Sequence, residues 1–180
     1  MNSKARRCAV DIIIFAILIL IDRLTKNWAV YRLKGNDPIP LISNVLELYY
    51  LPAGNSGAAF GMLSGHIALF LVIAAVVVIA IAYFIWNMPS DSKYRPLEIL
   101  MVFIAAGGVG NMIDRIAQGY VVDFIYISCI NFPIFNVADM YVSVCTVVLA
   151  FIVLFRLKEE DYERIESSLS IGRNRHKDRS

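Results

Sequence analysis

The sequence has little charge for its length. Charged residues make up 18% of the 180 residues, against roughly 25% in soluble domains, and hydrophobic residues make up 58%. This composition excludes an ordinary water-soluble globule, and the abundance of Ile, Val, Leu and Phe excludes a disordered chain. The net charge of +2 gives no indication of nucleic-acid binding. A membrane protein remains, and its length predicts one domain.

Cysteine and histidine are also scarce. Cys8, Cys129 and Cys145 lie far apart without a C-x-x-C pair, which argues against a disulfide scaffold and a zinc knuckle. The two histidines, His66 and His176, lie outside the long apolar runs, so a Ser-His triad, a Cys-His dyad and an H-E-x-x-H zinc site have poor support. Glycine-rich phosphate loops are missing as well. We therefore expect chemistry that requires no metal and no cofactor.

Four apolar stretches predict membrane-spanning helices. The clearest, Ile67 to Trp86, has no charge or amide over twenty residues, which reach about 30 Å and match a bilayer core. The expected spans are 9–30, 67–86, 97–116 and 137–156. The first follows basic residues, as in a signal peptide, but no small-residue cleavage site follows it. We interpret it as a retained helix.

The positions of Lys and Arg predict the orientation. Twelve of the seventeen lie in the N-terminal segment, in the 87–96 loop or after residue 155. Because such residues gather on the cytoplasmic side, both termini are expected there. Residues 1–156 form the expected membrane domain. The charged tail 157–180 is expected to be solvated, helical at first and frayed at its end, with binding to anionic lipid as the less favoured alternative.

Two segments on the outer side differ from ordinary linkers. Residues 38–51 and 119–135 are rich in β-branched and aromatic side chains and are bounded by Gly and Pro. They predict short strands on the outer membrane surface of an otherwise all-α polytopic protein. No internal repeat is present, so an inverted-repeat transporter has no support.

Several polar residues lie where lipid would be expected. A carboxylate near the bilayer centre costs roughly 2.5–3.5 kcal/mol, so each one is a functional hypothesis. All are expected near the outer surface, and helical spacing places those of each span on one face. They are Asp22 and Lys26, then Asn111, Asp114 and Arg115, then Asn136 and Asp139, with Asp123 in the loop before the last span. Gly107, together with Ala106, Gly108 and Gly110, would allow close helix contact beside them.

These residues also have structural interpretations. Asp22 with Lys26 could form a neutral pair at an interface, as could Asp114 with Arg115, and Asn136 with Asp139 could cap the last span. The convergence of so many polar residues at one depth favours a common site. Two neighbouring carboxylates cannot both ionise easily, so they share a proton and can act as an acid and a base.

Five blocks of sequence resemble the lipoprotein signal peptidases, the signal peptidase II family of bacterial membrane aspartyl proteases. The blocks are DRLTK (22–26), NSGAAF (55–60), GGVGNMIDR (107–115), VVDF (121–124) and FNVAD (135–139). The resemblance extends to about residue 156. It implies four transmembrane helices with a small extracytoplasmic β-cradle and a surface loop. It also implies cleavage of prolipoproteins before the diacylglyceryl-modified cysteine.

The same resemblance implies roles for individual residues. It places the catalytic pair on Asp123 and Asp139. The sequence alone makes Asp114 nearly as good a catalytic candidate as Asp123, and we place it second. The positions that line the site are Asn55, Asn111, Arg115 and Asn136, and the positions that support it are Asp22, Lys26 and Asp114. The sequence departs from the family at Gly54, where a larger polar or aromatic residue is expected.

We therefore expect a monomeric enzyme of the bacterial cell membrane with its active site near the outer face. Its partners would be lipid-modified prolipoproteins and membrane lipid. A proton- or ion-coupled carrier is the main alternative, and it would place charges through the depth of the bilayer. In a third interpretation, a non-catalytic scaffold, neutralising the acidic residues would only destabilise the fold.

Overall fold

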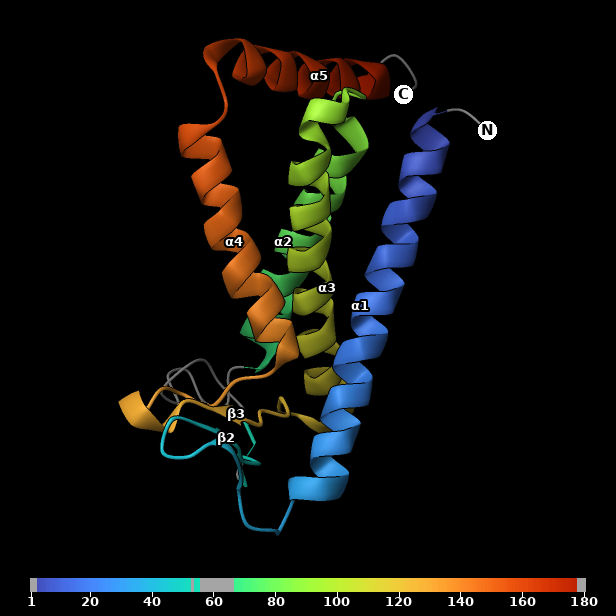
Figure 1. Cartoon of the computed structure of the whole chain (residues 1–180). Helices are drawn as coiled ribbons and strands as arrows, with labels where there is room; N and C mark the ends of the chain where they lie inside the picture. Colours follow the sequence, from blue (N-terminus) through green and yellow to red (C-terminus); the bar gives the residue numbers. More distant parts are fainter. Residues whose placement is uncertain (1–2, 53, 56–66, 178–180) are drawn as a thin grey trace.

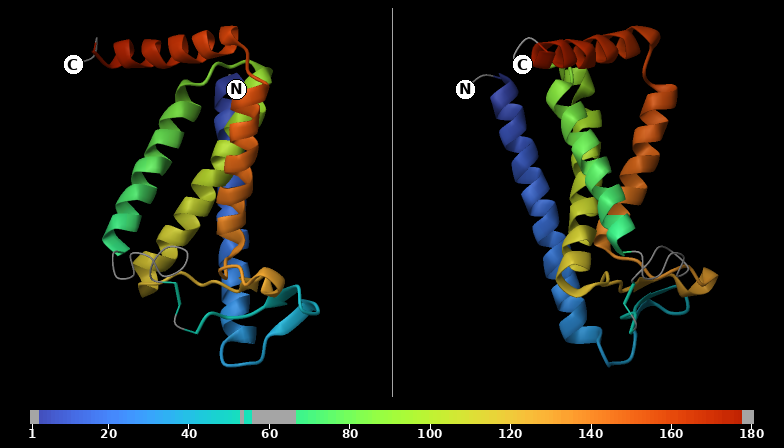
Figure 2. Two further views of the ribbon diagram at one scale, coloured as in Figure 1. Left: turned by 90° about the vertical axis from the view of Figure 1, so that its left-hand side faces the viewer. Right: turned by 180° about the vertical axis from the view of Figure 1, so that it is seen from behind.

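The computed structural model describes residues 3–52, 54–55 and 67–177. The helices of this part are α1 (Ser3–Leu33), α2 (Ile67–Asn87), α3 (Arg95–Gln118), α4 (Val137–Phe155) and α5 (Glu159–Lys177), and its strands are β1 (Ile39–Ile42), β2 (Leu46–Leu48) and β3 (Ile125–Tyr126). Helices α1 to α4 run alongside one another, with the strands at one end (Figure 1). Helix α5 crosses the other end, where both termini also lie (Figure 2).

The observed helices follow the predicted spans closely. Helices α2, α3 and α4 begin and end within two residues of the expected positions, and α1 extends further at both ends. Within the described residues, α2, the helical segment Ser92–Gln118 and α4 are long and apolar enough to cross a membrane. Helix α1 has 31 residues, about 46 Å, but Asp22, Arg23 and Lys26 make it more polar. Its crossing, and hence the count of four spans, stays a prediction.

Local sequence signals set the helix ends that surround the polar residues. Pro96 lies in the first turn of α3, where its missing N–H is not needed. Gly119 ends that helix in the left-handed conformation, with φ of 80°. Asn136 caps α4, and its side chain and that of Asp139 bond reciprocally to each other's backbone N–H groups. The last turn of α3 and the first turn of α4 therefore lie at the same end of the bundle.

Helix α3 packs against α1, α2 and α4. A Cβ atom on Gly107 would lie 2.5 Å from the backbone oxygen of Ala138 in α4, and one on Gly110 would lie 2.6 Å from Oδ2 of Asp22 in α1. The predicted close helix contact is confirmed at these two glycines. At Gly108 an added Cβ would be 3.6 Å from its nearest neighbour, which is ordinary contact.

A three-stranded antiparallel sheet in the order β1-β2-β3 confirms the short strands expected in both outer segments. Ile39 pairs with Leu48, and Glu47 pairs with Tyr126. Isolated bridges extend this pairing from Asn55 to Val121 and from Ile125 to Phe135. Beneath the sheet, a core of buried residues joins α1 to the outer segments: Ala29, Leu33, Tyr50, Val122 and Phe124. The backbone pairing places residue 123 between the segments that carry Asn55 and Asn136.

Helix α5 confirms that the tail 157–180 is helical at first, but part of the helix packs against the bundle instead of being fully solvated. The end of the tail, where fraying is expected, lies outside the described residues. Asp161 is only 3% exposed and accepts hydrogen bonds from Lys93 Nζ at 2.6 Å and Tyr94 OH at 2.9 Å. The hydrogen bond from the Lys93 ammonium lowers the pKa of Asp161 to about 2. Ile165 packs against the cluster formed by Met88, Tyr94 and Leu97.

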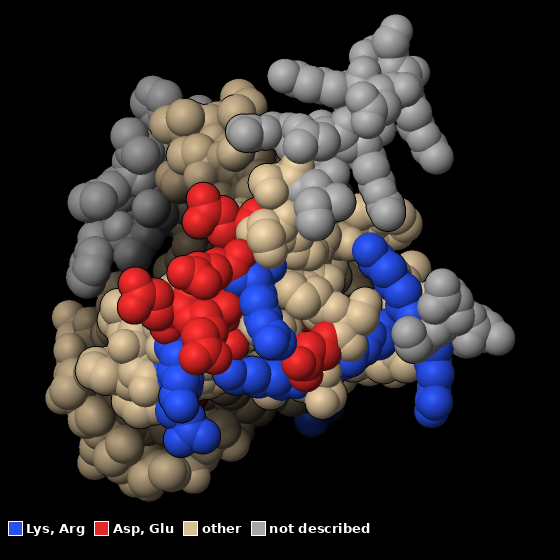
Figure 3. All heavy atoms as spheres, turned by 90° about the horizontal axis from the view of Figure 1, so that it is seen from above, with Lys and Arg blue, Asp and Glu red and all other residues tan. Residues whose placement is uncertain are grey.

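Seen from the α5 end, most acidic side chains gather in one patch, and Lys and Arg lie beside it (Figure 3). The exposed face of α5 carries Glu159, Glu160, Glu163 and Glu166, whereas Asp161 and Ile165 face the bundle. Helix α5 thus packs against the bundle through a few side chains, although most of its residues are polar or charged.

Candidate active site

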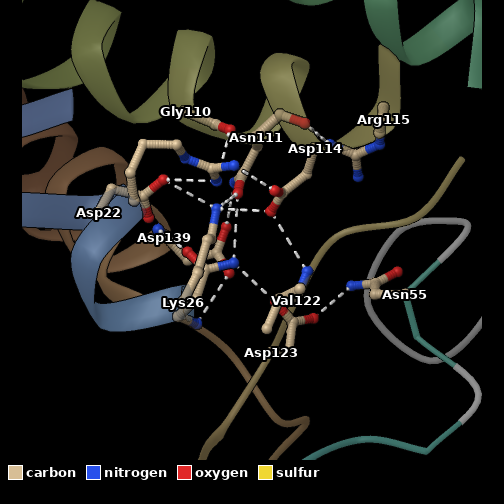
Figure 4. A network of polar contacts seen from close by, with 12 residues as sticks. Asp22, Lys26, Asn55, Gly110, Asn111, Asp114, Arg115, Val122, Asp123 and Asp139 are labelled. Atoms are coloured by element: carbon tan, nitrogen blue, oxygen red, sulfur yellow. Dashed lines mark hydrogen bonds and ion pairs between the residues drawn. The ribbon is translucent and has the colours of Figure 1, made fainter. Parts of the chain in front are cut away.

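Asp123 lies in the extended segment before β3 and is 1% exposed. Asn55 Nδ2 donates to its Oδ2 at 2.8 Å, and Asn136 Nδ2 donates to its Oδ1 at 2.6 Å. Figure 4 shows this carboxylate among the side chains of α1, α3 and α4. Two amides thus hold the orientation of a fully buried carboxylate.

Asp139 lies in the first turn of α4 and is half-buried. Its Oδ1 accepts from Asn111 Nδ2 at 2.8 Å, and its Oδ2 accepts from the backbone N–H of Asn136 at 3.1 Å. Asn136 therefore contacts both aspartates, one through its side chain and one through its backbone. The predicted cap is confirmed, and it does not conflict with the site interpretation, because the residue that starts the helix also contacts both carboxylates.

Lys26 of α1 contacts residues that surround this pair, and its side chain is 2% exposed. Its Nζ is 3.0 Å from Asp22 Oδ2, 2.9 Å from Asp114 Oδ2 and 2.9 Å from Asn111 Oδ1. An ammonium group has three N–H donors, and each of these acceptors can take one. Asp22 and Lys26 are thus a pair, as the neutral-pair interpretation expects, but within a larger network.

The carboxylate of Asp114 binds two cationic side chains and one backbone N–H group. Its Oδ1 accepts from Arg23 Nη1 at 2.6 Å, and its Oδ2 accepts from the Val122 N–H at 3.3 Å as well as from Lys26. Two positive charges compensate this carboxylate, which also holds the residue directly before Asp123. This geometry favours a supporting role for Asp114.

Arg23 is a residue of the network that the sequence reasoning missed. Its Nη2 lies 3.1 Å from Asp22 Oδ2 and 3.3 Å from the Gly110 carbonyl oxygen, besides the contact of Nη1 with Asp114. Residues i and i+1 of a helix do not face each other, so spacing gave no signal for an Asp22–Arg23 contact. The long Arg23 side chain nevertheless reaches the Asp22 carboxylate.

Arg115 contacts a different neighbour from the one considered in the sequence. Its guanidinium lies over the Phe70 ring of α2, 5.1 Å from the ring centre, and its Nη1 donates to the Asn111 carbonyl oxygen at 3.5 Å. Asp114 is paired with Arg23 and Lys26 instead. Arg115 thereby links α2 to the helix that carries Asn111.

The electrostatics of Asp123 suit proton transfer. Burial, followed by the negative charge of Asp139, raises the pKa of Asp123 from 3.8 to about 7. Near neutral pH Asp123 therefore retains its proton in a substantial fraction of the molecules. One carboxyl group can donate a proton while the other accepts one.

A second buried charge cluster, which the sequence reasoning did not place, lies at the opposite end of the bundle. Arg95 Nη2 is 2.5 Å from Asp11 Oδ1, and Arg95 Nη1 is 2.8 Å from Glu98 Oε2. Arg7 lies 3.6 Å from Glu98. Residues 12–21 and 99–113, which separate the two clusters along α1 and α3, contain no charged residue.

Part of the second sequence block lies outside the described residues. Asn55 is described, but residues 56–60 and His66 are not. Gly54 has φ of 64°, and a Cβ there would lie 2.3 Å from the Tyr120 ring, so glycine allows this ring to pack against the loop. Within residues 3–52, 54–55 and 67–177, no group of three or more His, Cys, Asp or Glu side chains is arranged to hold a metal ion.

The fold and the site define a helical membrane protein with paired aspartates at one end of its bundle. The sequence model described as "Signal peptidase (SPase) II" matches residues 14–155, and the chain belongs to this family. The matched region ends before α5.

Individual relatives agree with this assignment. The chain is 38% identical to a lipoprotein signal peptidase of Lactococcus lactis subsp. lactis over 149 residues, 83% of this chain and 95% of the relative. It is 43% identical to one of Halalkalibacterium halodurans over 130 residues, 71% of this chain and 80% of the relative. A solved structure described as a bacterial membrane enzyme, determined by the in meso method at 2.3 Å, superposes with a TM-score of 0.70 and 31% identity. That match covers 84% of this chain and 93% of the other.

Proposed function

We propose that this protein is an aspartic endopeptidase that removes the signal peptide of prolipoproteins by cleaving before the diacylglyceryl-modified cysteine. Asp123 and Asp139 are its catalytic pair. Family membership supports the reaction. The observation that carries the assignment of the pair is the position of Asn136, which donates to Asp123 Oδ1 at 2.6 Å and to Asp139 Oδ2 at 3.1 Å.

The pair works with one shared proton. The ionised carboxylate accepts a proton from water, and the oxygen of that water forms a bond to the scissile carbonyl carbon. The protonated carboxyl group donates its proton toward the carbonyl oxygen in the same step. When the C–N bond breaks, the carboxyl group that took the proton from water gives it to the nitrogen, which leaves as an amine. One hydroxyl of the tetrahedral intermediate returns its proton to the other carboxylate as the new carboxylic acid forms, which restores the pair with one proton. Asn55, Asn111 and Asn136 hold the two carboxylates during these steps.

The orientation follows from the same proposal. Four helices span the membrane, both termini are cytoplasmic and the carboxylate pair lies near the outer face. The sheet and the pair lie at the end of the bundle opposite the termini, and most Lys and Arg belong to the terminal end, which supports this orientation. The scissile bond would lie at the outer end of a substrate helix whose lipid chains remain in the bilayer. The enzyme acts as a monomer.

The carrier alternative is less well supported. A carrier needs charged groups through the depth of the bilayer so that access can alternate. The uncharged stretches 12–21 and 99–113 separate the site from the cluster around Arg95. This interruption favours an enzyme that works at one level of the membrane.

The test is cleavage of a lipidated prolipoprotein by purified protein in detergent, with the same precursor lacking its lipid as the comparison substrate. We expect cleavage of the lipidated form and none by Asp123→Asn or Asp139→Asn. Asp37→Asn, an exposed aspartate after α1, is the matched control and should cleave like the wild type. Retained cleavage in either variant of the pair would falsify the catalytic assignment. The scaffold alternative predicts that the wild type does not cleave and that both variants lose stability.

The orientation has its own test. Native Cys129 is exposed in the segment between β3 and α4, so a membrane-impermeant thiol reagent should label it in intact spheroplasts. Ser92→Cys, in the turn before α3 and combined with Cys129→Ser, should be protected until the cells are lysed. The reverse labelling pattern would contradict the proposed orientation.

A further inference from the structure

Arg23 is a charged residue that contacts the site and that the proposed reaction does not use. It binds Asp114 Oδ1 at 2.6 Å, Asp22 Oδ2 at 3.1 Å and the Gly110 carbonyl oxygen at 3.3 Å. Both carboxylates are buried, with Asp22 at 0% and Asp114 at 2% exposure. The guanidinium therefore supplies hydrogen bonds and positive charge to two groups that water does not reach.

The two carboxylates also bind Lys26, which has a third partner in Asn111. Lys26 has only three N–H donors, and Asp22, Asp114 and Asn111 together use all of them. The carboxylates of Asp22 and Asp114, the Lys26 ammonium and the Arg23 guanidinium together carry no net charge. Without Arg23, two buried carboxylates would compete for one ammonium group, and the neutral amide of Asn111 would be the weakest of its three acceptors.

Two donors to Asn111 Oδ1, Lys26 Nζ at 2.9 Å and Asn136 Nδ2 at 3.2 Å, fix which end of the Asn111 amide faces the carboxylate pair. Because an ammonium group only donates, it holds Asn111 Oδ1 toward itself at 2.9 Å. The Nδ2 group then points to Asp139 Oδ1 at 2.8 Å. If this amide turned over, its oxygen would face the Asp139 carboxylate and the hydrogen bond would be replaced by repulsion.

We propose that Arg23 is a positioning residue for the catalytic pair. By binding Asp22 and Asp114, it leaves one donor of Lys26 for Asn111, and Asn111 in turn orients Asp139. A second branch reaches the other aspartate, because Asp114 holds the N–H of Val122, the residue before Asp123. This inference rests on the proposed function, in which Asp123 and Asp139 perform the reaction.

The experiment compares Arg23→Gln with Arg23→Lys, with the double variant Asp22→Asn/Arg23→Gln and with the control Arg32→Gln. Arg32 is an exposed arginine of the same helix. Arg23→Gln should lower kcat for a lipidated prolipoprotein by about 10- to 100-fold with little change in KM, because the loss is one of alignment. Arg23→Lys should recover part of this loss, and Arg32→Gln should behave like the wild type.

The double variant separates positioning from simple destabilisation. It removes one of the two carboxylates that compete for Lys26, so it should be more active than Arg23→Gln even though it carries one more substitution. The pH profile gives a second measurement. In Arg23→Gln the uncompensated negative charge of Asp22 and Asp114, beside Lys26 and Arg115, should move the alkaline limb of kcat to higher pH, and the double variant should move it back.

The outcomes are distinct. A wild-type kcat and pH profile in Arg23→Gln would overturn the inference, and so would a double variant no more active than Arg23→Gln. If Arg23→Gln is not recovered folded, Arg23→Lys and the double variant carry the same comparison. A wild-type protein that cleaves no prolipoprotein would instead refute the proposed function on which the inference rests.

Discussion

Replacing Asp123 by asparagine should abolish cleavage and also make the fold more stable at alkaline pH. In the folded protein, burial and the charge of Asp139 raise the pKa of Asp123 from 3.8 to about 7. The folded state thus holds this proton more tightly than the unfolded chain does. The resulting stability is fully present below about pH 4 and is lost as the pH rises through about 7. At about 1.4 kcal/mol per pH unit, this interval corresponds to about 4 kcal/mol.

Asparagine does not titrate, so the variant should not lose this free energy. Its side chain can keep an oxygen toward Asn136 Nδ2, and its NH2 group would face Asn55, whose amide must then turn. The assay is thermal unfolding in detergent at pH 4 and pH 8. Between these values the stability of Asp123→Asn relative to the wild type should rise by up to about 4 kcal/mol, or about 10 °C in Tm.

The exposed control Asp37→Asn should follow the wild type at both pH values. An equal pH dependence of Tm in the wild type and in Asp123→Asn would refute the reasoning, because it would mean that residue 123 does not retain a proton in the folded state. Cleavage by Asp123→Asn would refute its catalytic role separately.

Asp114→Asn should destabilise the fold by about 3–5 kcal/mol, because the buried Lys26 and the half-buried Arg23 both lose a charged partner. Its turnover per folded molecule, measured after size-exclusion chromatography, should fall less than that of Asp123→Asn, and an equal fall would restore Asp114 as a catalytic candidate. Gly107→Ala should cost about 1–3 kcal/mol in thermal unfolding, because the new methyl group meets the Ala138 backbone oxygen, whereas Gly108→Ala should be tolerated. Equal effects of the two alanines would contradict the packing of α3 on α4. Asp161→Asn should expose α5 to limited proteolysis at neutral pH without changing the cleavage rate, and unchanged proteolysis would show that the Asp161 contacts do not hold α5.

The membrane helices were predictable because a bilayer restricts the sequence so strongly. Spans that face hydrocarbon carry long uncharged runs, here 67–86, 99–113 and 140–155, so the ends of α2, α3 and α4 could be predicted within two residues. Helix α5 was not predictable in this way. Among residues 159–170, Asp161 and Ile165 contact the bundle, and their signal is lost among the exposed glutamates.

The residues of the site could largely be predicted from the sequence, but the contacts between them could not. Charged and amide groups near lipid stand out, and their helical spacing showed that each helix presents them on one face. Spacing along a helix does not report contacts between helices, so Arg23 was missed, and the alternative pairing of Asp114 with Arg115 did not identify the cations that bind Asp114. The cluster of Asp11, Arg95 and Glu98 was missed for the same reason.

The sequence by itself determined a membrane protein with apolar helices and a set of polar residues that lipid would not tolerate unpaired. The sequence could determine this much because solvation by lipid or water acts on each residue separately. The tertiary structure decided which of these residues act together: backbone pairing between outer segments placed Asp123 between Asn55 and Asn136, and close packing at Gly107 and Gly110 brought α4 and α1 to α3. Hydrogen bonds and ion pairs depend on distances of about 3 Å between groups far apart in the chain, and only the folded arrangement fixes such distances.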